Sequence, residues 1–407
     1  MPSASGRQYH AIPGPSVMPD RVLRAMHRAA PNIYGDELTD IVASLFPDLQ
    51  RLAGTTQHVA IYIGNGHAAW EAANANVFSR GDKALVVATG HFGHGWANSA
   101  RGMGVDVQML DFGNRAPIDT EKLVEALRAD TGHSLRAVLV THVDTATTIR
   151  ADIAAVRAAM DAAGHPALLM VDCIASLGCD HFLMDDWGVD VMIAASQKGL
   201  MTPPGLSFVW FSNKARDVGR RADLRTPYWD WEPRVFGDMF YQFFCGTAPT
   251  HHIYGLREAL DMIFEEGLPA IWARHAALAG AVWAAVDAWG KGGPMELNVT
   301  DPTHRSHAVT ATRIGAPYGT QLRNWCEDEG GLTLGIGLGM AAPDDPAWHG
   351  FFRIAHMGHV NAHMTLGALA TMDAGLKAVG IPHGAGAIEA ATAAFARSRH
   401  TALAAAQ

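Results

Sequence analysis

The sequence predicts an α/β protein with a large domain built on a mainly parallel seven-stranded sheet and a smaller C-terminal α/β domain. Residues 38–211 alternate short apolar runs with Ala-rich helical stretches, which is typical of βαβ units. A second mixture of short strands and helices follows over residues 296–407. The chain has 407 residues, more than one hydrophobic core usually serves, so we expect two packed domains.

Seven runs in the first half of the chain have the length and the β-branched, apolar composition of strands. They cover residues 58–63, 84–88, 105–110, 137–141, 167–171, 191–194 and 207–211. Helices are expected between them at residues 68–78, 95–102, 120–129 and 153–163, the last with Asp152 as N-cap. Strands joined by helices run parallel to one another.

The second half of the chain begins with an aromatic segment at residues 228–244 and continues with helices at 254–265 and 268–288. The remainder is expected to hold strands 308–314 and 352–355 and helices 319–328, 361–379 and 385–406. We therefore place an N-terminal arm at residues 1–20, the large domain at 21–267 and the small domain at 268–407.

Composition excludes several classes of partner. A net charge of −9 and a pI near 6.1 leave no electrostatic footprint for nucleic acid or an anionic membrane. The four cysteines are widely spaced, which indicates neither a zinc knuckle nor a disulfide framework. The first ten residues lack an apolar signal core, and no apolar run reaches the ~18 residues of a membrane span. We expect a cytoplasmic protein with a small-molecule substrate.

Lys198 is the first candidate for chemistry. It follows an apolar strand and residues Ser196 and Gln197, and Gly199 comes directly after it. A random lysine is more often a solvated surface residue than a reactive one. At an apolar strand end, however, desolvation disfavours the ammonium form and produces the neutral amine that a Schiff-base lysine needs.

Asp172 is the second candidate, because it closes the very apolar run 167–171. Its carboxylate is expected at the C-terminal edge of a central strand, where open α/β sheets bind their ligands. An aspartate there can keep a pyridinium nitrogen protonated, although an aspartate that caps the next turn is the commoner outcome for a single residue.

Two glycine-rich turns follow other predicted strands. Residues 64–67, Gly-Asn-Gly-His, enter a helix whose first amides are suited to phosphate. The turn is neither a Walker loop nor a complete dinucleotide fingerprint, because Ala69 stands at the third glycine position. In the second turn, Phe92 lies between glycines and can lie flat on a planar ring. Lys198, Asp172 and these two turns all follow predicted strands, so coincidence is a poor explanation of their common placement.

The chain resembles the class V, fold-type I aminotransferases that depend on pyridoxal 5′-phosphate (PLP), and most closely the alanine/serine–glyoxylate group. The resemblance runs from Ile12 to about Gly367. Its motifs are Pro-Gly-Pro at 13–15, Gly-Asn-Gly-His-Ala-Ala-Trp-Glu at 64–71, Thr-His-Val-Asp-Thr at 141–145, Val-Asp at 171–172, Ser-Gln-Lys at 196–198 and Phe-Arg-Ile-Ala-His-Met-Gly at 352–358.

The resemblance implies roles around the cofactor ring. Lys198 is then the Schiff-base lysine and proton shuttle, and Asp172 pairs with the ring nitrogen. Phe92 stacks on one face of the ring, Ile174 packs on the other, and Thr145 contacts the hydroxyl side.

The resemblance also implies how phosphate and substrate are held. Backbone amides of Asn65, Gly66 and His67 bind the phosphate with the side chain of Gln197, and Thr247 reaches it from a partner subunit, which implies a homodimer. Arg353 corresponds to the arginine that grips the substrate carboxylate, a task suited to a planar guanidinium. The chain departs from the family at Ala146 and Thr148, where Ser-Thr-Gly is usual, and at Phe244, where a phosphate-binding tyrosine is frequent.

The function implied is ping-pong transamination between a small amino acid, such as alanine or serine, and glyoxylate or pyruvate. Alternatives of the same fold are a transaminase for pyridoxamine or aminoethylphosphonate with pyruvate, and a sulfur lyase, for which Cys326 is the only candidate nucleophile. A cofactor-binding protein without turnover and a dinucleotide-binding module are rivals that fold alone does not exclude.

Two further groups of residues have competing explanations. His356, His359 and His363 have a spacing that suits a metal site, but no carboxylate or thiolate joins them, and we expect no metal. The Trp-rich residues 228–231 are expected to form a lid or a dimer contact.

Overall fold

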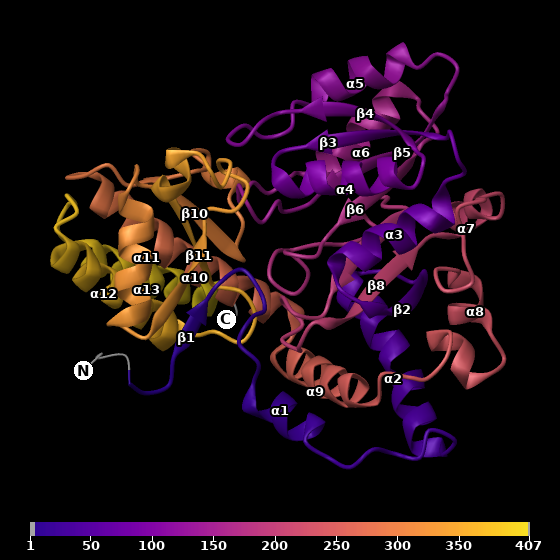
Figure 1. The fold of residues 1–407 in the computed structure, drawn as a ribbon, viewed down its shortest axis with the longest axis horizontal. Helices are drawn as coiled ribbons and strands as arrows, with labels where there is room; N and C mark the ends of the chain where they lie inside the picture. Colours follow the sequence, from indigo (N-terminus) through magenta and orange to yellow (C-terminus); the bar gives the residue numbers. More distant parts are fainter. Residues whose placement is uncertain (1–4, 406–407) are drawn as a thin grey trace.

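The computed structural model describes residues 5–405, and the side chains of residues 5–398. Two bodies lie side by side, each built on its own sheet, with the N-terminal segment running between them (Figure 1). The strands are β1 (Tyr9–Ala11), β2 (His58–Gly64), β3 (Lys83–Ala88), β4 (Asp106–Asp111), β5 (Leu135–Thr141), β6 (Leu168–Asp172), β7 (Val191–Ala195), β8 (Gly205–Phe211), β9 (Glu296–Leu297), β10 (Val309–Arg313), β11 (Leu332–Ile336) and β12 (Phe351–Ala355).

The helices cover both sheets. They are α1 (Asp20–Met26), α2 (Asp36–Ala53), α3 (Gly66–Val77), α4 (His91–Gly102), α5 (Thr120–Ala129), α6 (Ile153–Ala163), α7 (Asn213–Gly219), α8 (Trp231–Phe236), α9 (Thr250–Glu266), α10 (Leu268–Gly290), α11 (Tyr318–Asp328), α12 (Ala362–Val379) and α13 (Ala387–Ala405), with short 3₁₀ helices at Phe240–Phe244, Pro302–His304 and Pro346–Gly350. The predicted last helix, 385–406, matches α13 within the described residues; Ala406 lies outside them.

The larger sheet has seven strands in the order β2-β8-β7-β6-β5-β3-β4. All neighbouring pairs are parallel except those of β8, which runs antiparallel to both β2 and β7. The predicted mainly parallel seven-stranded sheet is confirmed. Strands β6 and β7 are buried along their whole length because helices cover both faces. The carboxyl ends of β2, β3, β5, β6 and β7 therefore open at one edge of the sheet.

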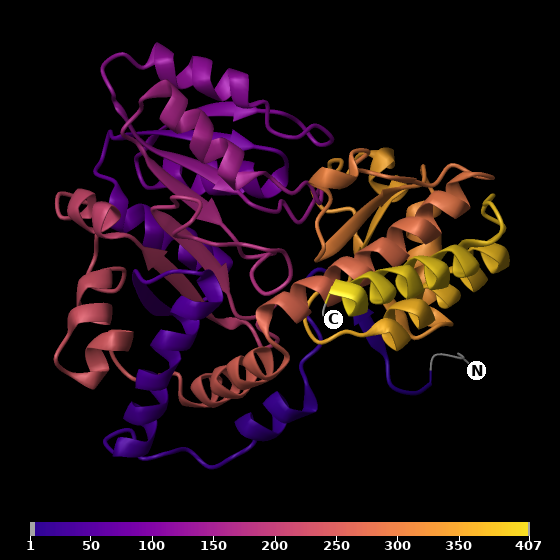
Figure 2. The ribbon, with the colours of Figure 1, turned by 180° about the vertical axis from the view of Figure 1, so that it is seen from behind.

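The smaller sheet has five strands in the order β1-β11-β12-β10-β9 and packs against α10, α11, α12 and α13. Its edge strand β1 comes from the N-terminal arm and pairs in parallel with β11, Tyr9 opposite Leu332 and Ala11 opposite Leu334. The long helix α10 runs from the end of α9 into this second body (Figure 2). The arm is thus part of the small sheet before it crosses to the large one.

Some local expectations differ from the structure, and the helix expected at 254–265 is one of them, because α9 already begins at Thr250. Helix α4 begins at His91, four residues before the predicted start at 95, because a carboxylate from another loop caps its first amides. In the Trp-rich segment, Trp231 is fully buried and stacks on Phe211 with ring centroids 4.0 Å apart, so this side chain belongs to the core and not to a lid. Among the described residues, no helix is long and apolar enough to cross a membrane.

Candidate active site

A cavity of about 250 Å³ opens at the carboxyl edge of the larger sheet. It collects residues that the sequence places far apart, since each follows a different strand. The lining residues are Asn65, Gly66, His67, Trp70, Phe92, Val143, Thr145, Asp172, Ile174, Ala175, Gln197 and Lys198. Nine of the predicted cofactor residues therefore share one cavity.

Lys198 lies in the turn after β7, held by a hydrogen bond from the Ser16 hydroxyl to its carbonyl oxygen at 2.6 Å. Its side chain is partly exposed because it faces the cavity. The amine donates a hydrogen bond to the Pro13 carbonyl. Desolvation, and then the positive charge of Arg353, lower the pKa of Lys198 to about 8, against the attraction of Asp172. A substantial neutral fraction at physiological pH makes the amine a competent nucleophile and base.

Asp172 ends β6 and is 4% exposed. One carboxylate oxygen accepts the indole N–H of Trp70 at 2.8 Å, and the other accepts the backbone N–H of Ile174 at 2.7 Å. Burial raises the pKa of Asp172 to about 7, and these two donors oppose the shift. A buried carboxyl with one side toward a cavity is suited to pair with a protonated ring nitrogen.

The turn into α3 is organised by Asn65, whose side-chain oxygen accepts the amides of His67 at 3.1 Å and Ala68 at 3.3 Å. Of the three predicted amide donors, His67 thus already has a partner. Gly66 leaves room for Ile174, because a Cβ there would lie 2.6 Å from Cδ1 of Ile174 and would displace the end of that side chain. The side-chain oxygen of Gln197 is buried and has no hydrogen-bond partner among the described residues.

Asp144 organises the neighbouring turn from a position with no exposed surface. One carboxylate oxygen accepts the amides of Phe92 at 2.7 Å and Gly93 at 3.2 Å, and the other accepts the amide of Ala146 at 2.9 Å. Burial raises the pKa of Asp144 although these amides oppose the shift. The carboxylate therefore fixes the Phe92 ring that borders the cavity.

Arg353 lies on β12 of the smaller sheet and is 5% exposed. Its Nε donates to the Ile336 carbonyl at 2.7 Å and one Nη donates to the Thr145 carbonyl at 2.9 Å. Burial lowers the pKa of Arg353 to about 10, and Asp144 partly opposes the shift. The guanidinium does not line the 250 Å³ cavity. Its hydrogen bond to Thr145, which does line the cavity, brings the smaller sheet against the larger body beside this site.

Other predicted residues have different surroundings. Thr247 is exposed and is not among the residues that line the cavity of its own chain. Phe244, at the position of a frequent family tyrosine, is 1% exposed and belongs to the core. Both ring nitrogens of His356 are bonded, to the His307 carbonyl at 2.7 Å and the Thr310 hydroxyl at 2.9 Å.

The departure at Thr148 has a structural consequence. Thr148 has φ +63°, a left-handed conformation that costs a β-branched residue energy and that glycine adopts freely. Its hydroxyl accepts the Ala311 amide at 3.2 Å, and its amide donates to the Asp144 carbonyl at 2.7 Å. The strained turn is thus tied both to the smaller sheet and to the Asp144 loop.

Trp70 and Asp144 carry no local sequence signal for the roles that they have here. Trp70 lies on α3 and reaches Asp172 across 102 residues of chain. Asp144 lies 52 residues from the amide of Phe92. Both lie within motifs at 64–71 and 141–145, which is the only indication that the chain itself gives.

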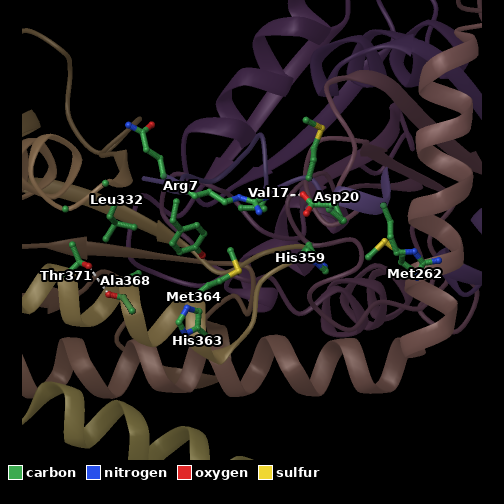
Figure 3. Close-up of a pocket in the computed structure, with 18 of the residues that line it drawn as sticks. Arg7, Val17, Asp20, Met262, Leu332, His359, His363, Met364, Ala368 and Thr371 are labelled. Atoms are coloured by element: carbon green, nitrogen blue, oxygen red, sulfur yellow. Dashed lines mark hydrogen bonds and ion pairs between the residues drawn. The ribbon is translucent and has the colours of Figure 1, made fainter. Parts of the chain in front are cut away.

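A separate, larger cavity of about 650 Å³ lies between the arm, α1, α9 and α12. Figure 3 shows Met364 and His363 of α12 on one side of it and Met262 of α9 on the other. None of the predicted site residues lines this cavity.

The fold is that of the fold-type I PLP aminotransferases. A family model described as Aminotransferase class-V matches residues 14–342, and the chain belongs to this family of PLP-dependent aminotransferases.

Named relatives extend the likeness over nearly the whole chain. A serine–glyoxylate aminotransferase of Methylorubrum extorquens is 38% identical over 96% of each chain. An L-aspartate–glyoxylate aminotransferase of Paracoccus denitrificans is 35% identical over 91% of each. Among solved structures, a pyridoxamine–pyruvate aminotransferase of Mesorhizobium loti matches with a TM-score of 0.87 and 26% identity, covering 98% of this chain and 99% of that one.

The buried carboxyl of Asp172 predicts a pH-dependent gain in stability. In the cofactor-free chain the pKa of Asp172 is about 7, whereas an unfolded aspartate titrates near 3.9, so folding stability is lost as the pH rises from about 4 to 7. Asp172→Asn removes this ionisation. Between pH 4 and pH 8 we expect the variant to gain up to about 4 kcal/mol relative to the original chain, on top of a constant, pH-independent loss from the N–H donor that the single amide oxygen no longer accepts.

Urea unfolding of the cofactor-free proteins at the two pH values measures the difference. Asp106→Asn, at the exposed start of β4, is the matched control and should change little. A variant whose stability relative to the original chain does not rise between the two pH values contradicts the raised pKa of the buried Asp172 carboxyl.

Proposed function

We propose that this aminotransferase moves an amino group from a small amino acid to glyoxylate or another small 2-oxoacid, with PLP linked to Lys198. The observation that carries the proposal is that Lys198 and Asp172 line one cavity, where the charges of Asp172 on β6 and Arg353 on β12 both act on the Lys198 amine. The names of the relatives, serine–glyoxylate and L-aspartate–glyoxylate aminotransferase, support glyoxylate as the acceptor.

The residues present fit PLP. The Gln197 side chain, whose buried amide oxygen has no partner among the described residues, can turn to present its NH2 group to a phosphate beside the first turn of α3, while Phe92 and Ile174 also border the cavity. Asp172 suits the ring nitrogen. When bound, PLP supplies an electron sink for the charge that develops at the substrate α-carbon.

The chain's own residues supply the remaining chemistry. Lys198, with its lowered pKa, takes the proton from the α-carbon and returns a proton to the cofactor side. Asp172 keeps the ring nitrogen charged, because its carboxylate is buried and held by Trp70 and Ile174. Arg353 uses two of its five donors on carbonyl groups, which orients the guanidinium plane and leaves donors for a carboxylate.

Both substrates of a ping-pong cycle use the same carboxylate site, so the donor and the acceptor are small molecules with matching carboxylates. Pyridoxamine with pyruvate is a second candidate pair, favoured by the Mesorhizobium loti structure, and aminoethylphosphonate with pyruvate is a third. A sulfur lyase has less support, because Cys326 is buried in α11 and burial raises the pKa of its thiol to about 12.

We also propose a cytoplasmic homodimer. Thr247 lies on the surface and suits a role at the phosphate site of a partner subunit. Exposed apolar side chains, including Tyr228, Met239 and Tyr241, occur in the segments before it, and such residues are enriched where subunits meet. The four unpaired cysteines suit a reducing compartment.

Absorbance spectroscopy tests the function. We expect a visible band from the lysine-linked cofactor, which borohydride abolishes, and bleaching of that band when a true amino donor is added alone. Serine, alanine, aspartate and pyridoxamine are compared in turn, and Lys198→Ala should lack the borohydride-sensitive band. A protein that cannot be loaded with PLP would overturn the proposal. If pyridoxamine bleaches the band and none of the amino acids does, the amino donor is pyridoxamine and not a small amino acid.

Arg353 gives a second test. Arg353→Ala should weaken binding of amino acid and oxoacid by about 2–5 kcal/mol, because a buried charged partner of the carboxylate is lost. Arg353→Lys keeps the charge but not the two-pronged geometry, so an intermediate loss is expected. The measurement is kcat/KM for each substrate, with cofactor absorbance as the control for loading. Unaltered kinetics in both variants would remove Arg353 from the site.

Subunit mixing tests the shared site. Thr247→Glu introduces a negative charge beside the partner's phosphate, and Lys198→Ala removes the lysine, so each variant alone should be inactive. Mixed after reversible unfolding, the chains form heterodimers with one intact site. We expect about a quarter of the original activity from an equal mixture. No recovery, with dimers present by light scattering, argues against a site shared between subunits.

A further inference from the structure

The arm joins the smaller sheet to the lysine turn through four residues. On one side, β1 is paired to β11 as far as Ala11 opposite Leu334. On the other, the Ser16 amide donates to the Gln197 carbonyl at 2.9 Å and its hydroxyl donates to the Lys198 carbonyl at 2.6 Å. Residues 12–15 therefore span the gap between the domains, fixed at both ends (Figure 1).

Within this span, the arm touches the reactive group itself. The Pro13 carbonyl accepts a hydrogen bond from the Lys198 amine. Gly14 has φ +98°, and a Cβ there would lie 2.7 Å from Cδ, Cε and Nζ of Lys198. Only a residue without a side chain lets the arm pass this close, so Gly14 is required by both its backbone conformation and its neighbour.

The same proline packs on the strand pair that carries the substrate-binding arginine. A Cβ at Gly335 would lie 2.6 Å from Cδ of Pro13, and Gly335 is the residue opposite Arg353 in the β11–β12 ladder. Pro13 thus has the lysine on one side and the Gly335–Arg353 pair on the other.

We propose that Pro13 and Gly14 are positioning residues for Lys198. The Pro13 carbonyl is the acceptor that holds the lysine amine whenever the amine is not bonded to the cofactor, and β1 ties that acceptor to the sheet that carries Arg353. The proposal rests on the proposed function, because the amine leaves the cofactor only during turnover or when no cofactor is bound.

The flexibility of the lysine side chain and the charges around its amine support this assignment. Holding a lysine side chain in one orientation costs about 2 kcal/mol of rotamer entropy. A free amine therefore samples several rotamers unless a hydrogen-bond acceptor holds it in one. The charged and titratable groups around the amine are Arg353 on β12, Asp172 on β6 and Cys179 in the loop after β6. Arg353 repels the ammonium, and Asp172 is already bonded to Trp70 and Ile174. The Pro13 carbonyl is the acceptor that the amine contacts.

The other side of the arm borders the larger cavity. Tyr9, Val17 and Met18 line this cavity together with Met364 of α12 and Met262 of α9 (Figure 3). The segments that flank the 12–15 span therefore border open volume, whereas the span itself packs against Lys198.

The test compares two glycines of the arm. Gly14→Ala pushes a methyl group into Lys198, whereas Gly6→Ala has the same kind of positive φ, +138°, with no atom within 4 Å. Ser16→Ala removes the hydroxyl anchor on Lys198 without adding a clash, and serves if Gly14→Ala does not fold. Circular dichroism confirms folding of each full-length variant.

The first readout needs no turnover. In protein freed of cofactor, the pH dependence of Lys198 modification by an amine reagent is followed by peptide mass spectrometry. An ammonium that loses its acceptor but stays buried gives up its proton more readily, so the midpoint should fall by about half a pH unit or more in Gly14→Ala and by less in Ser16→Ala. Gly6→Ala should match the original chain. An unchanged or raised midpoint in Gly14→Ala, or in Ser16→Ala if Gly14→Ala does not fold, overturns the proposal.

The second readout uses the loaded enzyme. A mispositioned amine slows proton transfer, so kcat should fall by about tenfold or more while KM changes little, and the kinetic isotope effect with an α-deuterated amino donor should rise. If kcat falls only in step with the free energy of unfolding, and the isotope effect does not rise, then Gly14 has a structural role only and the proposal is overturned. If the original chain neither binds PLP nor transaminates, the proposed function fails; if it does both while Gly14→Ala behaves like Gly6→Ala, only this inference fails.

Discussion

Four charged side chains gathered at a junction that excludes most water are the constraint on which this structure depends. Arg353, Asp172 and Asp144 are nearly or wholly buried, and Lys198 lines a cavity together with Asp172. Burial disfavours the charged form of every one of these groups, so each pKa moves toward neutrality. Two cations beside two carboxylates make the arrangement tolerable, because removal of one partner would leave an uncompensated buried charge.

The junction also explains why the surrounding elements are built as they are. Asp144 draws the first turn of α4 toward it, Trp70 of α3 reaches Asp172, and the Thr145 carbonyl holds Arg353. Each contact joins a different loop of the larger sheet, or the larger sheet to the smaller one. The active site is therefore an interdomain contact first, and its reactivity follows from how completely that contact excludes solvent.

Much of this could be predicted from the sequence, because the signals involved are local. The apolar strand runs that precede Lys198 and Asp172 predict the sheet and these two central residues. Arg353 is predicted only by the resemblance of residues 352–358 to the family motif. Contacts made across the fold leave no such signal: Lys198 meets Pro13 across 185 residues, and Asp144 caps α4 across 51. The α4 start was predicted wrongly for the same reason, since its cap comes from a distant loop. Thr148 shows a further limit, because a positive φ at a β-branched residue runs against local preference and is sustained by tertiary bonds.

The pairing of β1 with β11 has a consequence for biosynthesis. His10 and Thr333, which face each other in this ladder, are 323 residues apart. A ribosome adds roughly 5–20 residues per second, so the first strand leaves the ribosome tens of seconds before its partner exists. The larger sheet can assemble in that interval, but the arm has nothing to dock on, and the lysine pocket stays open on that side. Closure of the pocket on that side must therefore wait until β11 has been made, although the segment that closes it is among the first to be synthesised.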